Sequence, residues 1–169
     1  MAASTVVIAN TTPLINFAEI GRLELLRDLF GDITMPTAVA EELRLKAELF
    51  PLAALACQAT FIKVRSPANP AAVIALQHEL HLGEAECIAL AQEELTALLI
   101  LDDVAARTVS QRQNFRLTGT IGCLQLAKRR GLIPRIGPLL SELRDKARFW
   151  LSPRLIERVL EDAHESSAE

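Results

Sequence analysis

Short apolar runs alternate with helix-like periodicity along this chain. The runs Thr5–Ala9 and Ala97–Leu101 lack the polar–apolar alternation of a half-exposed strand and are about five residues long. Such runs are typical of strands that are covered on both faces, as in parallel sheets. The pattern therefore predicts a layered α/β fold with a mostly parallel sheet.

The same pattern places the other elements. Further strands are predicted at 33–34, 61–64 and 115–117. Helices are predicted at 13–18, 23–30, 36–47, 49–57, 70–81, 84–95, 103–113, 119–130, 138–149 and 153–165. Thr12 is expected to cap the first helix, with Pro13 as its first residue. The Pro-rich segment 66–70 is too short for a domain linker, so we expect one domain over 1–169.

Composition narrows the class of protein. With 169 residues, 50% of them hydrophobic, the chain can build a substantial core. No apolar stretch approaches the roughly 18 residues that span a bilayer. The segment Met1–Ser4 carries no basic signal-peptide region, and the three cysteines lack metal or disulfide spacing. We therefore expect a cytoplasmic protein with no membrane partner.

Charge gives a weaker indication. The net charge is −3, so the whole chain does not attract polyanions strongly. Basic residues nevertheless cluster late in the chain, from Arg107 onward. Solvated helix faces explain most of them, while a basic surface beside an acidic cleft stays open as an alternative.

Polar residues follow both apolar strands directly. Asn10, Thr11 and Thr12 come after the first strand, and Asp102 and Asp103 come after the strand at 97–101. The carboxyl ends of parallel strands meet at one edge of a sheet, where ligands bind. Oxygen ligands suit a hard divalent cation, and adjacent carboxylates repel each other unless a cation is present. A helix-capping role for Asp103 is the structural alternative.

Helical geometry separates two glutamates from their neighbours. Glu42 borders the apolar face of the helix at 36–47, whereas Glu41 lies nearly opposite that face. Glu84 falls on the buried side of the helix predicted at 84–95, and Glu86 falls on the opposite side of that helix. Glu42 could simply extend to water, and Glu84 could interact with the helix dipole. We favour a metal because the other oxygen ligands are expected at the same sheet edge.

Five segments together resemble the PIN-domain family, in the bacterial and archaeal branch related to toxin-type ribonucleases. They are VVIANTTPLI (6–15), MPTAVAEEL (35–43), LGEAECIALA (82–91), LILDD (99–103) followed by Arg107, and TGTIG (118–122). Each motif is weak alone, but they occur in the family's order. The resemblance implies a three-layer α/β/α sandwich with a core at about 5–131 and a C-terminal helical extension at about 132–165.

The resemblance also implies a site that binds Mg²⁺ or Mn²⁺. The family's acidic positions fall on Asn10, Glu42 and Glu84, and on the pair Asp102 and Asp103, of which Asp103 is the closer match. The four carboxylates are the expected catalytic residues, and all five side chains are the expected metal ligands. Thr11, Thr12 and Arg107 are expected to contact substrate. Asn10 departs from the family, which usually has Asp there, and so removes one negative charge from the site.

The function implied is that of a metal-dependent endoribonuclease, the toxin of a toxin–antitoxin pair. The alternative is a catalytically impaired module that binds RNA or a protein. A phosphatase-like hydrolase is a third option, but it lacks an Asp nucleophile at Asn10. The expected partners are RNA, an antitoxin protein and a second copy of the chain, bound through apolar helix surface at 49–57 and 138–160.

Overall fold

The computed structural model describes residues 5–165, so the expectation made from Met1–Ser4 lies outside the described residues. The strands are β1 (Val6–Ala9), β2 (Ile33–Pro36), β3 (Ile62–Arg65), β4 (Ala97–Ile100) and β5 (Arg116–Thr118). The helices are α1 (Thr11–Glu19), α2 (Leu23–Phe30), α3 (Thr37–Leu45), the 3-10 turn η1 (Lys46–Glu48), α4 (Leu55–Gln58), α5 (Pro70–Leu76), α6 (Leu82–Gln92), α7 (Val104–Arg112), α8 (Thr120–Arg129), α9 (Gly137–Asp145) and α10 (Pro153–Asp162).

All five strands are parallel, in the order β3-β2-β1-β4-β5. The chain first moves outward from β1 through β2 to β3 and then crosses back to β4 on the other side of β1. The order of strands therefore reverses between β1 and β4, and the carboxyl ends of these two strands form the crevice where open α/β sheets bind ligands. A hydrogen bond of 3.2 Å from the Asn10 amide to the Ile100 carbonyl joins the strands at that end.

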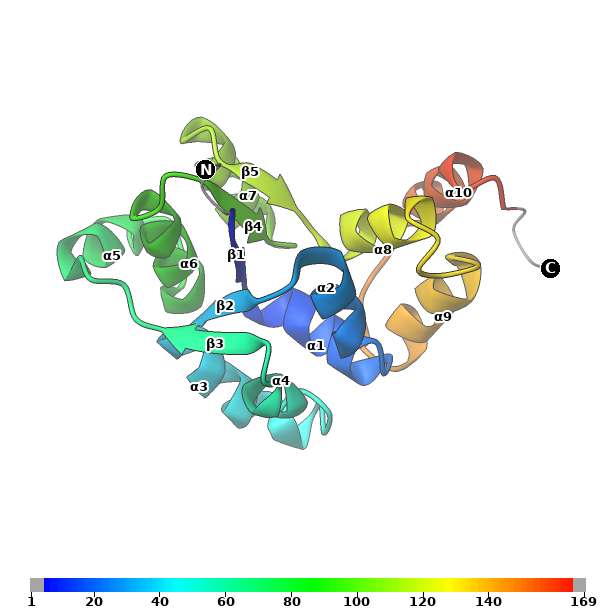
Figure 1. Cartoon of the computed structure of the whole chain (residues 1–169), viewed down its shortest axis with the longest axis horizontal. Coiled ribbons are helices and arrows are strands. Elements are labelled where there is room, and N and C mark those ends of the chain that lie inside the picture. Colours follow the sequence, from blue (N-terminus) through cyan, green and yellow to red (C-terminus); the bar gives the residue numbers. More distant parts are fainter. Residues whose placement is uncertain (1–4, 166–169) are drawn as a thin grey trace.

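Helices cover both faces of the sheet, which gives the three-layer α/β/α sandwich (Figure 1). Helix α6 packs against β1, β2 and β4 on one face, with α5 and α7 beside it. Helices α1, α2 and α8 form the opposite layer and contact one another. The three inner strands β1, β2 and β4 are buried from both sides: Ile8, Ile33, Leu99 and Ile100 are fully inaccessible to water. The continuous apolar runs of β1 and β4 predict this, whereas the edge strands β3 and β5 are more exposed.

Several helices end earlier than predicted, such as α5 at Leu76 and α9 at Asp145, and two predicted helices differ in a more informative way. Helix α1 begins at Thr11, with Asn10 in extended conformation at its N-cap position, and so Thr12 is not the cap and Pro13 is not the first residue. Proline fits there because amides of the first helical turn have no partner within the helix. The helix predicted at 49–57 is reduced to the single turn α4, because turns occupy the chain around Pro51, which has no amide proton to donate.

The C-terminal helices pack against the same chain. Leu139, Leu140 and Leu143 of α9 are buried, as are Val159 and Leu160 of α10. These residues contributed to the apolar surface expected to pair with another chain. These leucines and the valine are therefore covered within the monomer. Within 138–160 the exposed large apolar side chains are Trp150 and Leu155, and in the other predicted segment they are Leu49, Leu52 and Leu55.

Glu165, which follows helix α10, connects the end of this helix to the start of α9. Its side chain is only 6% exposed, and it accepts hydrogen bonds from the amides of Ile136 (2.8 Å) and Gly137 (3.0 Å). The Lys128 ammonium lies 3.2 Å away. Burial alone would raise the pKa of Glu165, but the two amides and Lys128 outweigh it and lower that pKa below its usual value.

We expect Glu165→Gln to lower the free energy of unfolding at neutral pH by about 1–3 kcal/mol, since hydrogen bonds to a charged group are lost. A lowered pKa contributes stability above the unfolded-state pKa, and this contribution is lost as pH falls through the folded-state pKa. The difference between the two proteins should therefore shrink in acid. Urea denaturation at neutral and acid pH measures it, with the exposed Glu161→Gln as the control. An equal loss at both pH values would contradict the ionic role.

Candidate functional site

A cleft of about 580 Å³ opens at the carboxyl edge of the sheet, next to the crevice between β1 and β4. Six of the eight predicted site residues line it: Asn10, Thr11, Thr12, Glu42, Glu84 and Asp103. They come from four parts of the chain, namely the end of β1 with the start of α1, helix α3, the first turn of α6 and the residue before α7. The structure thus brings these side chains to one place.

The direction of helix α6 explains why Glu84 reaches the cleft. Helix α6 precedes the parallel strand β4 and runs back across the sheet, so its N-terminus lies at the carboxyl edge. Gly83 allows a close approach there, because a Cβ at this position would lie 3.2 Å from Val39 Cγ2 and 3.4 Å from both Asn10 Oδ1 and Glu42 Oε2. The oxygens of Asn10 and Glu42 therefore flank the same point of the helix backbone.

Asn10 is the least satisfied polar residue of the cleft. It is 5% exposed, and its Oδ1 is the one buried side-chain nitrogen or oxygen among residues 5–165 that has no hydrogen-bond partner. Leaving a buried acceptor unpaired costs about 1–3 kcal/mol. A buried acceptor without a partner needs an explanation, and a bound cation is one that the neighbouring carboxylates fit.

Glu42 is surrounded by donors. It accepts a hydrogen bond from the Thr11 hydroxyl (2.5 Å), and the Lys46 ammonium lies 2.6 Å from its other oxygen. Burial would raise the pKa of Glu42, but the bonds from Lys46 and Thr11, together with the charges of Lys46 and His81, lower it overall. Glu42 is therefore ionised at neutral pH, and a lysine of the same helix acts as its counter-ion.

Glu84 is in the opposite situation. It is 9% exposed, and its one hydrogen bond comes from the His81 amide (3.0 Å), which is the helix-end interaction that the sequence left open. Burial raises the pKa of Glu84, and the negative charges of Asp103 and Glu42 add to the rise, against the lowering effect of that amide. The like charges around Glu84 are the arrangement that a bound cation relieves.

Asp103 completes the group from the exposed side. It lies at the N-cap of α7 and accepts a hydrogen bond from the Ala106 amide (3.0 Å), so the capping alternative holds as a structural fact. The carboxylates of Glu42, Glu84 and Asp103 thus each accept a hydrogen bond from a nearby group of the protein. Accordingly, no three His, Cys, Asp or Glu side chains within residues 5–165 are gathered as a finished metal-binding group.

The oxygen set nevertheless fits a hard divalent cation. It offers an unpaired amide oxygen at Asn10 and three carboxylates, and oxygen is the ligand atom that Mg²⁺ and Mn²⁺ prefer. Glu84 and Asp103 each use one carboxylate oxygen for a backbone amide, which leaves the other oxygen of each for a cation.

Asp102 and Arg107 lie elsewhere. Asp102 accepts hydrogen bonds from the amide (2.8 Å) and the hydroxyl (2.6 Å) of Thr120, and Thr120 in turn accepts one from the buried Asn16 (3.0 Å). Burial raises the pKa of Asp102, although Thr120 and the nearby Arg107 act in the opposite direction. The structure thus places Asp102 at the start of α8, in a hollow that it shares with Arg107 and that does not include Asp103.

The sequence pattern missed the roles of two residues, Lys46 in the cleft and Glu86 beside it. Lys46 lies four residues after Glu42, a spacing that pairs opposite charges on a helix, and this signal was available. Glu86 was placed on the outer side of its helix, but its carboxylate accepts a hydrogen bond from the Ala38 amide (2.9 Å) and so fixes the start of α3 beside the cleft. That contact joins segments far apart in sequence and has no local signature.

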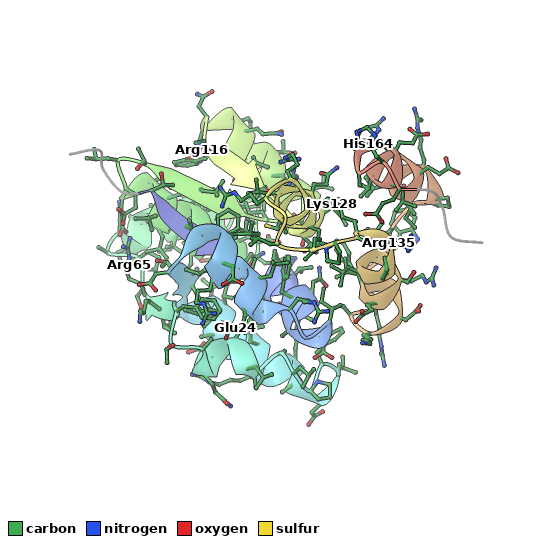
Figure 2. The ribbon with its side chains drawn as sticks, turned by 45° about the vertical axis from the view of Figure 1, so that its right-hand side comes forward. Glu24, Arg65, Arg116, Lys128, Arg135 and His164 are labelled. Carbon is green, nitrogen blue, oxygen red and sulfur yellow. The ribbon has the colours of Figure 1, made fainter. Side chains whose placement is uncertain are left out.

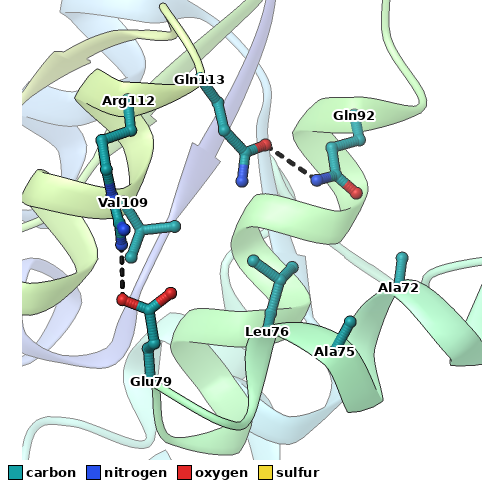
Figure 3. Close-up of a pocket in the computed structure, with 8 residues that line it drawn as sticks. All are labelled: Ala72, Ala75, Leu76, Glu79, Gln92, Val109, Arg112 and Gln113. Carbon is teal, nitrogen blue, oxygen red and sulfur yellow. Dashed lines mark hydrogen bonds and ion pairs between the residues drawn. The ribbon is translucent and has the colours of Figure 1, made fainter.

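Another hollow lies away from the sheet edge. It measures about 350 Å³ and is formed by α5, the turn after it, α6 and α7 (Figure 3). The ion pair Glu79–Arg112 (2.5 Å) closes one end and the hydrogen bond from Gln92 to Gln113 (2.8 Å) closes the other. Its floor is made of small apolar side chains, so it lacks the converging oxygens of the cleft.

The parallel sheet, its helical layers and the oxygen-lined cleft at the strand ends define a three-layer α/β/α protein with a candidate metal site. A family model described as PIN domain matches residues 6–165, and the chain therefore belongs to the PIN-domain family. This confirms the resemblance noted in the sequence. No curated protein and no solved structure matches the chain. Within residues 5–165, no helix combines the length and apolar character needed to cross a bilayer.

Proposed function

We propose that this chain is a Mg²⁺- or Mn²⁺-dependent endoribonuclease whose active site is the cleft between β1, α3, α6 and α7. PIN domains generally use divalent metal ions, and the family suggests RNA as the substrate. The observation that supports the proposal most is the buried, unpaired Oδ1 of Asn10 beside Glu42 and the like-charged Glu84. A cation at this point satisfies the amide oxygen and removes the repulsion at once.

The residues have separate roles in this proposal. Asn10, Glu42, Glu84 and Asp103 hold the ion. When bound, the ion supplies Lewis-acid chemistry for phosphodiester hydrolysis. Thr11 positions Glu42 through its hydroxyl, and Thr12, half-buried at the same helix start, can donate to a phosphate oxygen.

Cleavage of a labelled single-stranded RNA tests the proposal. The native chain should cleave the RNA in the presence of Mn²⁺ or Mg²⁺, and cleavage should stop when EDTA removes the metal ion. Ca²⁺ in place of Mn²⁺ provides a control for charge alone. Cleavage that persists in EDTA would contradict a metal-dependent mechanism.

A catalytically impaired PIN-like module is the second candidate, and two observations favour it. Asn10 supplies no charge, and Lys46 already neutralises Glu42 at 2.6 Å, so an entering cation must compete with a tethered ammonium. This candidate predicts RNA or protein binding that is the same in Mn²⁺ and in EDTA, with no cleavage in either.

Two neighbouring aspartates should respond differently to mutation. Asp103→Ala is expected to abolish Mn²⁺ binding with a loss of about 1 kcal/mol of stability, the usual cost of removing a helix cap. Asp102→Ala should cost more stability, about 2–3 kcal/mol, because Thr120 loses a charged acceptor in a buried network. Calorimetric Mn²⁺ titration and urea denaturation of both variants measure the contrast. If Asp102→Ala alone abolished Mn²⁺ binding in a folded protein, the assignment would have to be reversed.

Exposed leucines beside the cleft offer a surface for the antitoxin or second chain that a toxin-type nuclease is expected to bind. We expect that nuclease to act in the cytoplasm. Leu45 lines the cleft, and Leu49, Leu52 and Leu55 follow it on the surface. We propose this apolar surface, Leu45–Leu55, as the place where an antitoxin segment or a second copy of the chain docks. Purification from the native operon followed by light scattering tests it: a lone monomer would contradict both partners.

A further inference from the structure

Positive charge is concentrated in one part of the chain. Residues 104–158 contain twelve Lys or Arg and three Asp or Glu, a net formal charge of +9 in a chain whose total is −3. Figure 2 shows Arg116, Lys128 and Arg135 of this segment on strand β5, helix α8 and the turn before α9, whereas Glu24 lies in the other half of the molecule. Such a segment attracts the phosphate backbone of a nucleic acid even though the whole protein is acidic.

The chain's only tryptophan is exposed within this basic segment. Trp150 is 80% exposed, in the connection between α9 and α10. The connection is held firmly: Ala147 and Leu151 are buried on either side, and the Phe149 amide donates to the Leu143 carbonyl (3.0 Å). Arg148 adopts a left-handed φ of 54°, which is unfavourable for a residue with a side chain and turns the loop. The fold thus presents a large aromatic ring to water on a fixed loop.

Trp150 lines a hollow of about 410 Å³ at the same sheet edge as the acidic cleft. Phe149 and Arg107 line it too. The Arg107 guanidinium is anchored by one nitrogen, which donates to the Leu101 carbonyl (2.8 Å). This fixes its position, and among the described residues no hydrogen bond uses its other nitrogens. The hollow therefore combines an aromatic face with a positioned cation.

We propose that Trp150 and Arg107 form a nucleotide subsite for the RNA strand, in which the base stacks on the indole and a phosphate meets the guanidinium. This inference rests on the proposed ribonuclease function and deepens it. Asp102 lines the hollow and Asp103 lines the cleft, so the subsite and the acidic cleft adjoin through consecutive residues. A strand seated on Trp150 can extend directly to the metal ligands. Because stacking needs an unpaired base, the subsite selects single-stranded RNA at this position.

The chemistry of the surroundings favours RNA over a protein partner. A docked protein is expected where exposed apolar side chains lie together, as on the surface Leu45–Leu55. The hollow at Trp150 also has apolar walls, including Phe149 and Leu155, but these walls lie beside the Arg107 guanidinium. Trp150 instead lies in sequence between Arg148 and Arg154 of the basic segment. Its hollow holds the Arg107 guanidinium, with unused donors, next to the hydrogen-bonded Asp102. An exposed aromatic ring with a cation beside it is the combination that binds single strands without sequence preference.

Intrinsic fluorescence reports on this subsite alone, because the full chain contains one tryptophan. The experiment is a titration in EDTA with an unstructured RNA oligonucleotide, so that binding is measured without cleavage. We expect saturable quenching of Trp150 emission by the single strand, and little or none by the same sequence as a duplex. Inorganic polyphosphate, which offers charge without bases, should bind without quenching.

Matched variants complete the test. By anisotropy of a labelled oligonucleotide, Trp150→Ala should bind roughly 5- to 100-fold more weakly, whereas Trp150→Phe keeps most of the affinity. Leu95→Ala removes another highly exposed apolar side chain, at the amino edge of the sheet opposite the hollow, and should bind as the native chain does. RNA binding without quenching, equal quenching by duplex or polyphosphate, or quenching only by an acidic apolar peptide would each overturn the subsite. Loss of cleavage alone would not, since binding is measured without metal.

Discussion

Glu84→Gln should reduce RNA cleavage by roughly 10²- to 10³-fold while leaving the fold intact. Glutamine has the same shape and can still accept the hydrogen bond from the His81 amide, but it removes an anionic ligand from the centre of the cleft. The same change should raise Tm at neutral pH by about 1–3 °C, because the cost of burying the charge and the repulsion from Asp103 and Glu42 both disappear. Activity and stability are thus expected to move in opposite directions.

The gain in stability should depend on pH. The pKa of Glu84 is raised in the folded protein, by burial first and by Asp103 and Glu42 in addition. Between the unfolded-state and folded-state pKa values, the folded protein binds more protons, so the native chain loses stability as pH rises through this interval. Glu84→Gln does not titrate there. The difference in Tm should be near zero at about pH 4, below both values, and should open as pH rises.

Glu86→Gln is the matched control for both measurements. It lies two residues away on the same helix, and its carboxylate faces the Ala38 amide rather than the cluster of carboxylates. Its cleavage rate should stay close to that of the native chain. If Glu84→Gln cleaved RNA as fast as Glu86→Gln does, Glu84 would have no place among the metal ligands.

Asn10→Asp should tighten Mn²⁺ binding by roughly 10- to 100-fold. A new unit charge about 4 Å from a cation contributes on the order of several kcal/mol at the effective dielectric constant of a partly buried site, part of which desolvation cancels. Without divalent ions, the added carboxylate lies beside Glu42 and close to Glu84, so the variant should be less stable than the native chain. Stability should then rise more steeply with Mn²⁺ concentration.

Titration calorimetry and thermal melts over a range of Mn²⁺ concentrations measure these effects. Asn114→Asp is a suitable control, because it adds the same charge at an exposed turn outside the cleft. Equal Mn²⁺ affinities for Asn10→Asp and the native chain would show that Asn10 is not a ligand. A cleavage rate that rises with the tighter binding would identify Asn10 as the reason for a weak native activity.

Much of the fold follows from local pattern. The strands β1 and β4, the helix α2 and the inward direction of Glu84 are predicted by apolar runs and helical periodicity, and the structure agrees with each of them. The helix predicted at 49–57 forms only the turn α4, because the chain turns around Pro51. A helix is predicted there because Leu49, Leu52 and Leu55 are spaced like an amphipathic face, but these side chains are exposed in the monomer. Periodicity alone does not tell whether a partner surface exists.

The site is less accessible to sequence reasoning. Asp102 and Asp103 are equivalent in the sequence, and they separate only because Thr120 and Asn16 meet Asp102 in a buried network. Lys46 is visible as the helical partner of Glu42, but its competition with a cation emerges only from the cleft geometry. The position of Trp150 beside Arg107 depends on how the C-terminal helices fold back, which no local motif encodes.

Anomalous diffraction from a crystal soaked in Mn²⁺ tests the central claim most directly. The account predicts a Mn²⁺ peak in the cleft, in contact with the Asn10 amide oxygen and with carboxylate oxygens of Glu42, Glu84 or Asp103. The Lys46 ammonium should then have moved away from Glu42. A soaked crystal with no peak in this cleft, or with Mn²⁺ held instead at Asp102, would contradict the assignment of the metal site.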